Sequence, residues 1–392
     1  MKVLMLRGWD FLTYAATFKT LETSGVGATE FQLLQHARAL QKLGHEVRIL
    51  GVTREDCIQE GIQFLGADGQ ENSLLRIRED CGDTDVVFTN ATRDLGRLRA
   101  ALPAATIIEV CQNGPHFEND QHIDLYAFVS AAQFAYYAVR YRKRRSKFVL
   151  LLSVPPWKAV YSKIEPVTEL DQVVWLGSLQ KQGLRRWAKA MSLLMKEHAS
   201  LRWVLCVPSY DVVVSVDLPD VFFGIDLPAD RVEFKNLSFR ELAQEIRRSK
   251  LLVASLGGED GPMSYLDGHA AGVPVLCGDD IYGKVSNPEG TGLRCSTTTD
   301  CLRALEFLIA NPDVRKQMGE MGRKWIAQNL TEDQQYATIE QIMAYVALRR
   351  THALPIKSGA QSDAKFSCSY WLERLEIKIS NLIPRMERSG RA

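Results

Sequence analysis

The sequence predicts an α/β protein made of two successive domains, each built around a parallel sheet. Short apolar stretches alternate with longer amphipathic stretches along most of the chain, and this alternation is typical of parallel strands with helices on both faces. A proline-rich stretch at 155–166 interrupts the series, which starts again at Gln172. The chain has 392 residues, enough for two domains of ordinary size. We therefore expect two Rossmann-like domains, at residues 1–160 and 167–330.

The first domain begins with a strand, followed by a helix and further strands. Residues 28–43 predict an amphipathic helix, because Phe31, Leu34 and Leu40 fall near one face. Gly44 ends this helix, as glycine commonly does. Continuous apolar stretches predict strands that are covered on both faces; they lie at residues 3–6, 46–52, 85–89, 106–111, 126–129 and 148–152.

The second domain repeats this alternation and ends in a series of helices. Its expected strands lie at residues 172–176, 202–207, 232–234, 251–255 and 273–277. Its expected helices lie at residues 184–197, 240–248, 300–311, 313–328 and 332–349.

The last part of the chain, residues 351–392, differs from both domains. Residues 351–365 are polar and contain proline and glycine, so they read as a linker. Residues 369–388 have the apolar spacing of a short amphipathic helix. Such a helix would either dock onto the protein or lie on a membrane surface.

Composition excludes some classes of function. The net charge is +1, which gives no electrostatic argument for nucleic acid as a partner. No apolar stretch is long enough to span a bilayer. The eight cysteines are scattered without a Cys-x-x-Cys pair, so we expect reduced core residues, with no zinc site, in a cytoplasmic protein.

A dense basic run at residues 140–147 has two interpretations. One interpretation is the solvated C-terminal end of a helix, where cations interact favourably with the helix dipole. It is also typical of contact with anionic lipid or with a phosphorylated acceptor, which would place the protein at the inner face of the membrane.

The strongest functional signal lies between Glu259 and Leu276. Glu259 and Asp267 are two carboxylates eight positions apart, and a Gly-Pro turn between them opens into a helical stretch. A loop that becomes a helix N-terminus is a natural place to hold phosphate. One ligand of nucleotide-sugar length would reach both carboxylates and the amides between them. The simpler interpretation is a helix with a charged cap.

This stretch resembles the signature of family-4 glycosyltransferases, with five further residues in register: Leu266, Ala270, Gly272, Pro274 and Val275. These are retaining enzymes of the GT-B fold, in which two Rossmann-like domains face each other across a cleft. The resemblance implies that residues 1–160 hold the acceptor and residues 167–330 the donor. It also implies that a helix at 331–350 returns to the N-terminal domain.

The resemblance assigns roles to the signature itself. It implies that Glu259 contacts the transferred sugar and that Asp267, in place of a second glutamate, binds the ribose hydroxyls. Pro262 replaces an expected glycine and has no N–H to donate. The amides of Met263 and Ser264 stay available as donors to the phosphates.

Two further loops resemble the same family. Gly25 and Gly27 precede the helix that leads into Gly-His-Glu-Val, and the resemblance places this loop near the donor phosphates and the acceptor. Gly177 and Ser178 follow the strand at 172–176, and Lys181 lies shortly after them. The resemblance implies that Lys181 neutralises the diphosphate. Ser178 stands where the family has an arginine, a charge that Arg185 or Arg186 would have to replace.

A catalytic-site histidine follows the middle strand of the N-terminal domain in this family. His116 is the nearest candidate here, displaced by a few residues, and Asn113 is a second candidate for a polar contact to the sugar. The alternative is that His116 is a loop residue without chemistry.

The resemblance implies transfer of a sugar from a nucleotide diphosphate sugar, UDP- or GDP-linked, to a hydroxyl acceptor such as a glycan, glycolipid or small natural product. No cofactor is expected, and no metal, because developing charge would be stabilised by Lys181 and backbone amides. Two alternatives stay open: a nucleotide-sugar epimerase of GT-B architecture, and a catalytically degenerate GT-B partner protein.

Overall fold

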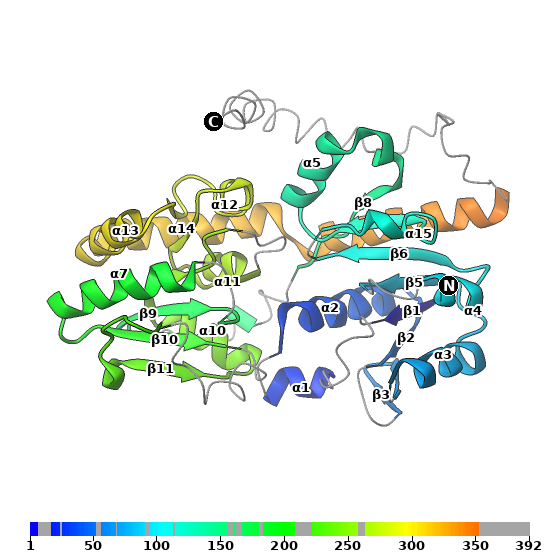
Figure 1. Cartoon of the computed structure of the whole chain (residues 1–392), viewed down its shortest axis with the longest axis horizontal. Helices are drawn as coiled ribbons and strands as arrows, with labels where there is room; N and C mark the ends of the chain where they lie inside the picture. The colour runs from blue at the N-terminus through cyan, green and yellow to red at the C-terminus, as the bar shows by residue number, and fades with distance from the viewer. Residues whose placement is uncertain are drawn as a thin grey trace.

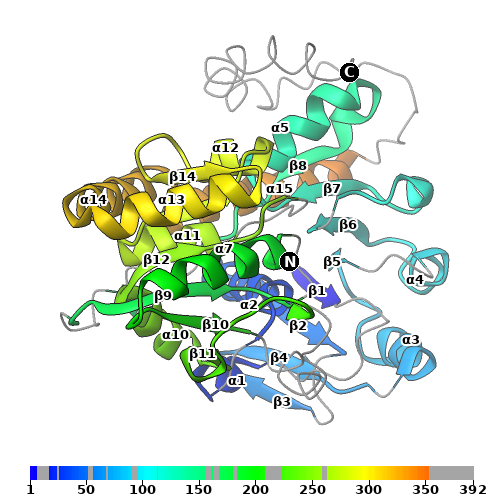
Figure 2. The ribbon, with the colours of Figure 1, turned by 60° about the vertical axis from the view of Figure 1, so that its left-hand side comes forward.

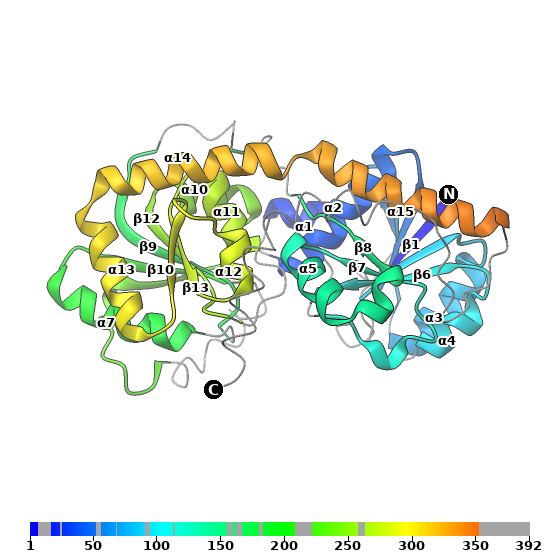
Figure 3. The same ribbon diagram turned by 90° about the horizontal axis from the view of Figure 1, so that it is seen from above.

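The structure is a computed structural model, and it describes residues 1–6, 17–23, 26–51, 56–67, 69–90, 95–112, 114–154, 160–161, 167–179, 183–207, 222–257 and 263–352 (Figure 1). Two sheets lie side by side along the long axis, and two successive helices run along both of them (Figure 3). Among the helices of these ranges, none combines the length and apolar character needed to cross a bilayer.

The first sheet has eight strands in the order β3-β4-β2-β1-β5-β6-β7-β8. All neighbours are parallel except the pair β3 and β4, which form a hairpin. The strands are β1 (Lys2–Leu6), β2 (Glu46–Leu50), β3 (Cys57–Gln59), β4 (Ile62–Leu65), β5 (Val86–Thr89), β6 (Thr106–Cys111), β7 (Leu125–Phe128) and β8 (Phe148–Leu150). The sheet therefore grows outward in both directions from the neighbours β1 and β5.

Helices cover both faces of this sheet because successive side chains of each strand point to opposite sides. On β1, Val3 and Met5 join one apolar cluster, while Leu4 and Leu6 join the other. The cluster of Val3 includes helices α1 (Phe18–Thr23), α2 (Ala28–Lys42) and α15 (Glu332–His352); that of Leu4 includes α3 (Gly69–Asp80), α4 (Leu95–Ala101) and α5 (Ala131–Arg140).

Helix α2 is buried on more of its circumference than an amphipathic surface helix would be. Phe31, Leu34 and Leu40 are buried as the apolar spacing predicts, but the polar side chains of Gln35 and His36 are buried as well. Helix α15 packs against α2 and contributes to the same apolar cluster, and Nε2 of His36 lies 3.2 Å from the carbonyl of Leu152. Residues far from α2 in the sequence thus cover faces of this helix.

The second sheet has six strands, all parallel, in the order β11-β10-β9-β12-β13-β14. They are β9 (Leu170–Leu176), β10 (Arg202–Cys206), β11 (Val232–Lys235), β12 (Ser249–Val253), β13 (Val275–Gly278) and β14 (Gly292–Cys295). Helices α7 (Leu184–Glu197) and α13 (Thr298–Ala310) pack on one face, and α10 (Phe239–Arg247) and α11 (Met263–Ala271) on the other (Figure 2). Three fully buried tryptophans, Trp175, Trp187 and Trp203, fill the face under α7.

The chain returns to the first sheet through two long helices (Figure 3). Helix α14 (Pro312–Asn329) packs against α11 of the second sheet. Helix α15 follows it, and its residues Ile339, Ile342 and Val346 lie in the apolar cluster of the first sheet. The expected return of the C-terminal helix is thus confirmed.

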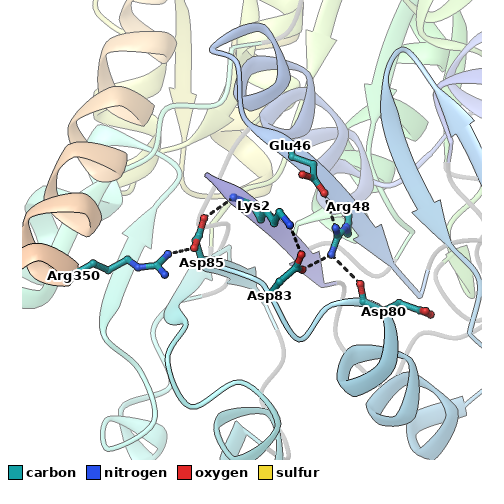
Figure 4. Close-up of polar contacts among 7 residues, drawn as sticks. All are labelled: Lys2, Glu46, Arg48, Asp80, Asp83, Asp85 and Arg350. Atoms are coloured by element: carbon teal, nitrogen blue, oxygen red, sulfur yellow. Dashed lines mark hydrogen bonds and ion pairs between the residues drawn. The ribbon is translucent and has the colours of Figure 1, made fainter.

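A cluster of charged side chains fixes the end of α15 to the first sheet (Figure 4). Arg350 pairs with Asp85, and Asp85 also accepts the backbone N–H of Lys2 at 2.7 Å. Asp83 pairs with Lys2 and, at 2.8 Å, with Nη1 of Arg48. The hydrogen bonds from Lys2 and Arg48 lower the pKa of Asp83 to about 2. These groups lie at the amino ends of β1 and β5, opposite the edge where ligands of such sheets bind.

Candidate active site

The carboxyl edges of the two sheets face each other. In a parallel α/β unit each helix begins at the carboxyl end of the preceding strand. Phe31, in the first turn of α2, packs its ring 4.8 Å from the ring of Phe239, the first residue of α10. Met263, the first residue of α11, joins the apolar cluster of the first sheet. We call this region, where the carboxyl ends of the strands of both sheets meet, the interdomain edge.

The second sheet has its switch point between β9 and β12. The chain builds β10 and β11 on one side of β9 and then crosses to β12 on the other. At such a point the loops after the two strands diverge, and ligands bind in the crevice between them. The loop after β9 contains Gly177 and Ser178, and the loop after β12 leads into α11 with its signature. Topology therefore brings the two sequence motifs to one place.

The loops of the interdomain edge contact one another at Leu256. A Cβ on Gly183, after β9, would lie 2.4 Å from the Cβ of Leu256, and one on Gly278, the last residue of β13, would lie 2.3 Å from its carbonyl oxygen. Trp187 of α7 donates its Nε1–H to the carbonyl of Ala254 at 2.7 Å. The loops are thus in direct contact, so each depends on the others for its position.

Three described residues of the predicted donor site lie on α11 and are buried. Met263, Ser264 and Asp267 are 8%, 4% and 6% exposed. The Oγ of Ser264 is buried and has no hydrogen-bond partner among the described residues. Met263 and Ser264 lie in the first turn of the helix, where backbone amides have no acceptor within the helix. Such amides are the groups that a phosphate would engage.

Asp267 lies deeper in α11, beside the linker between the sheets. The hydroxyl of Tyr161 donates to the backbone carbonyl of Asp267 at 3.3 Å. Burial and the negative charge of Asp267 raise the pKa of Tyr161 well above its usual value. The contact of Asp267 with ribose stays a prediction. Glu259 and Lys181, the other two charged residues of the predicted site, lie outside the described residues.

On the first sheet, Gly27 is the N-cap residue of α2, and Gly25 lies outside the described residues. The carboxylate of Glu30 folds back over Gly27: a Cβ there would lie 2.3 Å from its Oε2. Glu30 is 5% exposed. A negative charge of the protein itself therefore sits beside this helix N-terminus, where the resemblance implied donor phosphates. An acidic residue in the first turn of a helix was the sequence signal for it.

His116 follows β6 and pairs with a carboxylate that the sequence interpretation missed. Its Nδ1 lies 2.8 Å from Oε1 of Glu109, and its backbone N–H donates to the same oxygen at 2.9 Å. Glu109 is 1% exposed, within the apolar sequence of β6. A single charged residue in a continuous apolar strand was the signal that would have found it, because a buried charge requires a partner.

Gln112, at the carboxyl end of β6, links three elements of the first sheet. Its Nε2 donates to Oε1 of Gln32 at 3.0 Å and lies 3.4 Å from the carbonyl of Thr29, both in α2. Its Oε1 accepts from Nδ2 of Asn90, which follows β5. Sequence reasoning did not single out Gln112. Its neighbour Asn113, the second candidate for a sugar contact, lies outside the described residues.

Arg185 and Arg186, the two candidates to replace the arginine that is missing at position 178, bind backbone carbonyls of other segments. Nη2 of Arg185 donates to the carbonyl of Phe223 at 2.8 Å, and Nη1 of Arg186 donates to that of Ser296 at 3.0 Å. Each guanidinium thus fastens α7 to a neighbouring loop.

The basic run is partly structural. Lys147 Nζ binds Asp120 Oδ1 at 3.0 Å and the carbonyl of Ile123 at 3.0 Å. Arg144 lies over the ring of Phe117 at 4.5 Å. Lys147 and Arg144 therefore hold the loop after β6. Contact with a membrane stays a prediction for the rest of the run.

Comparison with solved structures finds similar folds at low sequence identity. Sucrose-phosphate synthase from Thermosynechococcus elongatus aligns with a TM-score of 0.66 and 13% identity, over 89% of this chain and 99% of that one. HepE from Anabaena, in complex with UDP-glucose, aligns with a TM-score of 0.67 and 13% identity, over 88% and 100%. A UDP-forming α,α-trehalose-phosphate synthase from Burkholderia vietnamiensis aligns with a TM-score of 0.60 and 10% identity, over 89% and 99%. No protein-family model and no curated protein matches the sequence. The architecture and these likenesses agree that the chain has the GT-B fold.

Proposed function

We propose that this protein is a glycosyltransferase that takes its sugar from a UDP-sugar. The observation that carries the proposal is the position of the signature helix α11. It follows β12 at the switch point of the second sheet, and Met263 at its first residue meets the facing sheet. A nucleotide sugar held there would present its sugar to the first domain. Residues 167–330 would then hold the donor and residues 1–160 the acceptor.

The proposed chemistry is transfer of the sugar to a hydroxyl group with retention of configuration. Lys181 and the amides of Met263 and Ser264 would hold the diphosphate and stabilise its charge as the sugar leaves. Glu259 would contact the sugar and Asp267 the ribose. This arrangement needs no metal ion, and the acceptor is a hydroxyl compound of a class that the chain leaves open.

The solved structures support UDP as the nucleotide. HepE is in complex with UDP in one structure and with UDP-glucose in another. The trehalose-phosphate synthase is described as UDP-forming. These ligands belong to those proteins, and they select UDP as the first nucleotide to test on this chain.

A thermal-shift screen with UDP, GDP, ADP and dTDP, with and without EDTA, tests the donor site. A ligand of the native state at 100 times its Kd adds about 2.7 kcal/mol to stability and raises the melting temperature. We expect UDP to give the largest shift, with no effect of EDTA, and we expect Asp267→Ala to abolish it. Equal shifts for all four nucleotides, or none, would contradict the proposal.

A catalytically degenerate GT-B partner is the second candidate. Ser178 replaces a charged residue, and the two neighbouring arginines bind backbone carbonyls. The two candidates differ in turnover. The first predicts that a UDP-sugar and a panel of hydroxyl acceptors release UDP, and that Glu259→Ala stops the release while UDP still binds. The second predicts UDP binding without turnover for the unmodified protein.

A further inference from the structure

Three buried polar groups on one face of the first sheet have no hydrogen-bond partner among the described residues. They are Nε2 of Gln35, Oγ of Ser153 and Nε2 of Gln335, and their residues are 6%, 3% and 3% exposed. Gln35 lies on α2, Ser153 follows β8, and Gln335 lies in the first turn of α15. A buried polar group without a partner destabilises the fold, and ordered water is the usual partner of such groups.

The alternation of side chains after β8 places Ser153 on the face of the sheet that α2 and α15 cover. Leu152 and Val154 belong to the apolar cluster of the opposite face. Leu151 belongs to the cluster that contains residues of α2 and α15. Because successive side chains of an extended chain point to opposite faces, Ser153 lies on the same side as Leu151.

The spacing of residues along the two helices brings both glutamines to this layer. Gln335 is four residues before Ile339, which is buried in the cluster beneath α15, and residues four apart share one face of a helix. Gln35 is seven residues before Lys42, whose Nζ donates to the hydroxyl of Tyr336 in α15 at 3.2 Å. Residues seven apart also share a face, so Gln35 lies on the side of α2 that faces α15.

Direct hydrogen bonds join the same three elements beside the unpartnered groups. The carbonyl of Leu152 accepts Nε2–H of His36 at 3.2 Å, and the N–H of Leu152 donates to Oγ1 of Thr338 at 3.4 Å. The hydroxyl of Thr338 donates to the carbonyl of Gln335 at 2.8 Å. These bonds hold α2, the segment after β8 and α15 together at one place. We call it the polar junction, made of Gln35, His36, Leu152, Ser153, Gln335 and Thr338.

The polar junction lies where both chain connections between the domains reach the first sheet. The chain leaves this sheet after β8 and returns from the second sheet at the start of α15 (Figure 3). Ser153 belongs to the outgoing connection and Gln335 to the returning one. A molecule bound to both residues would therefore link the two connections at their common end.

We propose that the polar junction binds an ordered water molecule through Gln35, Ser153 and Gln335, and that this water links the two connections between the domains. Buried waters typically make about three hydrogen bonds to groups that otherwise have no partner, and the junction offers three such groups. The water oxygen accepts from the two amides, and one of its hydrogens is donated to Oγ of Ser153. No substrate takes part, so the water site is independent of the proposed function.

Thermal unfolding of Ser153→Ala, Gln335→Met and the double variant tests the shared water. Each single change removes one partner of the water and leaves the other groups incompletely bonded, so we expect each to lower the melting temperature by about 2–4 °C. Either change alone already breaks the bridge, so the double variant should lose less than the sum of the two. A higher melting temperature in either single variant would show that the group lacks a water partner, and would overturn the proposal.

Trp203→Phe provides the matched control for this comparison. Nε1 of Trp203 is also buried without a partner among the described residues, but it lies beneath α7 in the second sheet. Because it shares no water with the polar junction, Ser153→Ala and Trp203→Phe should have additive effects on the melting temperature. If Ser153→Ala and Gln335→Met are additive in the same way, the two residues do not share a water and the link is overturned. Circular dichroism confirms that each variant is folded.

A crystal structure of the unmodified protein at high resolution locates the water directly. We expect one ordered water within about 2.7–3.2 Å of Nε2 of Gln35, Oγ of Ser153 and Nε2 of Gln335. Electron density in which these groups bind other protein atoms, with no water between them, would overturn the proposal whatever the thermal results.

Discussion

At the scale of single residues, close packing decides which substitutions the interdomain edge tolerates. Gly183 has φ of +90° and lies against Leu256 so closely that a Cβ would overlap it. A Cβ on Gly27 would likewise meet the carboxylate of Glu30, which is the end of a flexible side chain and can shift. Glycines in such a sequence motif are interpreted as leaving room for a ligand. In this structure, however, protein atoms already occupy the space beside them.

Gly183→Ala tests this crowding. The left-handed backbone costs an alanine about 1–2 kcal/mol, and the overlap with Leu256 adds about 1–3 kcal/mol. Gly224→Ala is the matched control, since it has φ of +72° with nothing within 4 Å of the added Cβ. We expect a larger fall in melting temperature for Gly183→Ala, measured by calorimetry. Equal losses in the two variants would show that Leu256 yields without cost.

At the scale of elements, local capping sets where several helices begin. Helix α13 starts with a capping box: Oγ1 of Thr297 accepts the N–H of Asp300 at 3.1 Å, and Oδ2 of Asp300 accepts that of Thr297 at 3.0 Å. This helix covers the same cluster as α7, with Cys301 and Leu305 fully buried. Its start was expected at residue 300, two residues late, because the cap extends the helix to Thr298.

Thr297→Ala removes the acceptor of this cap and should destabilise the protein by about 1 kcal/mol. Thr297→Ser keeps a hydroxyl at the same place and should retain most of the stability. Urea unfolding followed by circular dichroism measures both. If serine costs as much as alanine, the methyl group of Thr297 is what matters and the cap contributes little.

At the scale of the whole molecule, the last described helix, α15, packs against the sheet that contains the first strand of the chain. Arg350 pairs with Asp85 at the amino end of β5 (Figure 4). Arg349 lies 3.3 Å from Asp124, at the amino end of β7. The residues that follow the second sheet therefore pack against the first sheet and are anchored at its amino edge. Its charged end cluster also gives the protein a specific sensitivity to acid.

Asp83 should make stability fall in acid. Its pKa is lowered to about 2 by Lys2 and Arg48, so its carboxylate stabilises the fold above the unfolded pKa of about 3.9. That contribution is lost as pH falls from about 4 to 2. Asp83→Asn should weaken the protein at pH 7 and flatten this part of the stability curve, measured by thermal melts. Asp226→Asn, at a side chain 84% exposed, is the control, and an equally flattened curve there would contradict the assignment.

The sequence by itself determined the α/β class, the restart of the strand series and most of the elements. Strand β6 has the expected bounds, and β9 and α7 lie where expected, because continuous apolar runs and helical spacing are local signals. It gave no signal for the β3–β4 hairpin, for α3 and α4 or for β14, whose sequences are short or weakly apolar. Of α5 it predicted only the C-terminal end, at the basic run of residues 140–147.

Only the tertiary structure decided which residues share a site. Topology brought the loops of β9 and β12 together, the segment after β8 placed the carbonyl of Leu152 beside the ring of His36, and β6 placed Glu109 beside His116. Such contacts join residues distant in the chain, and neither spacing nor composition encodes the side chain that will lie opposite. The physical reason is that the role of a buried charge or of a closely packed glycine depends on the residue that lies beside it in space. That neighbour is fixed only when the sheets and helices have packed together.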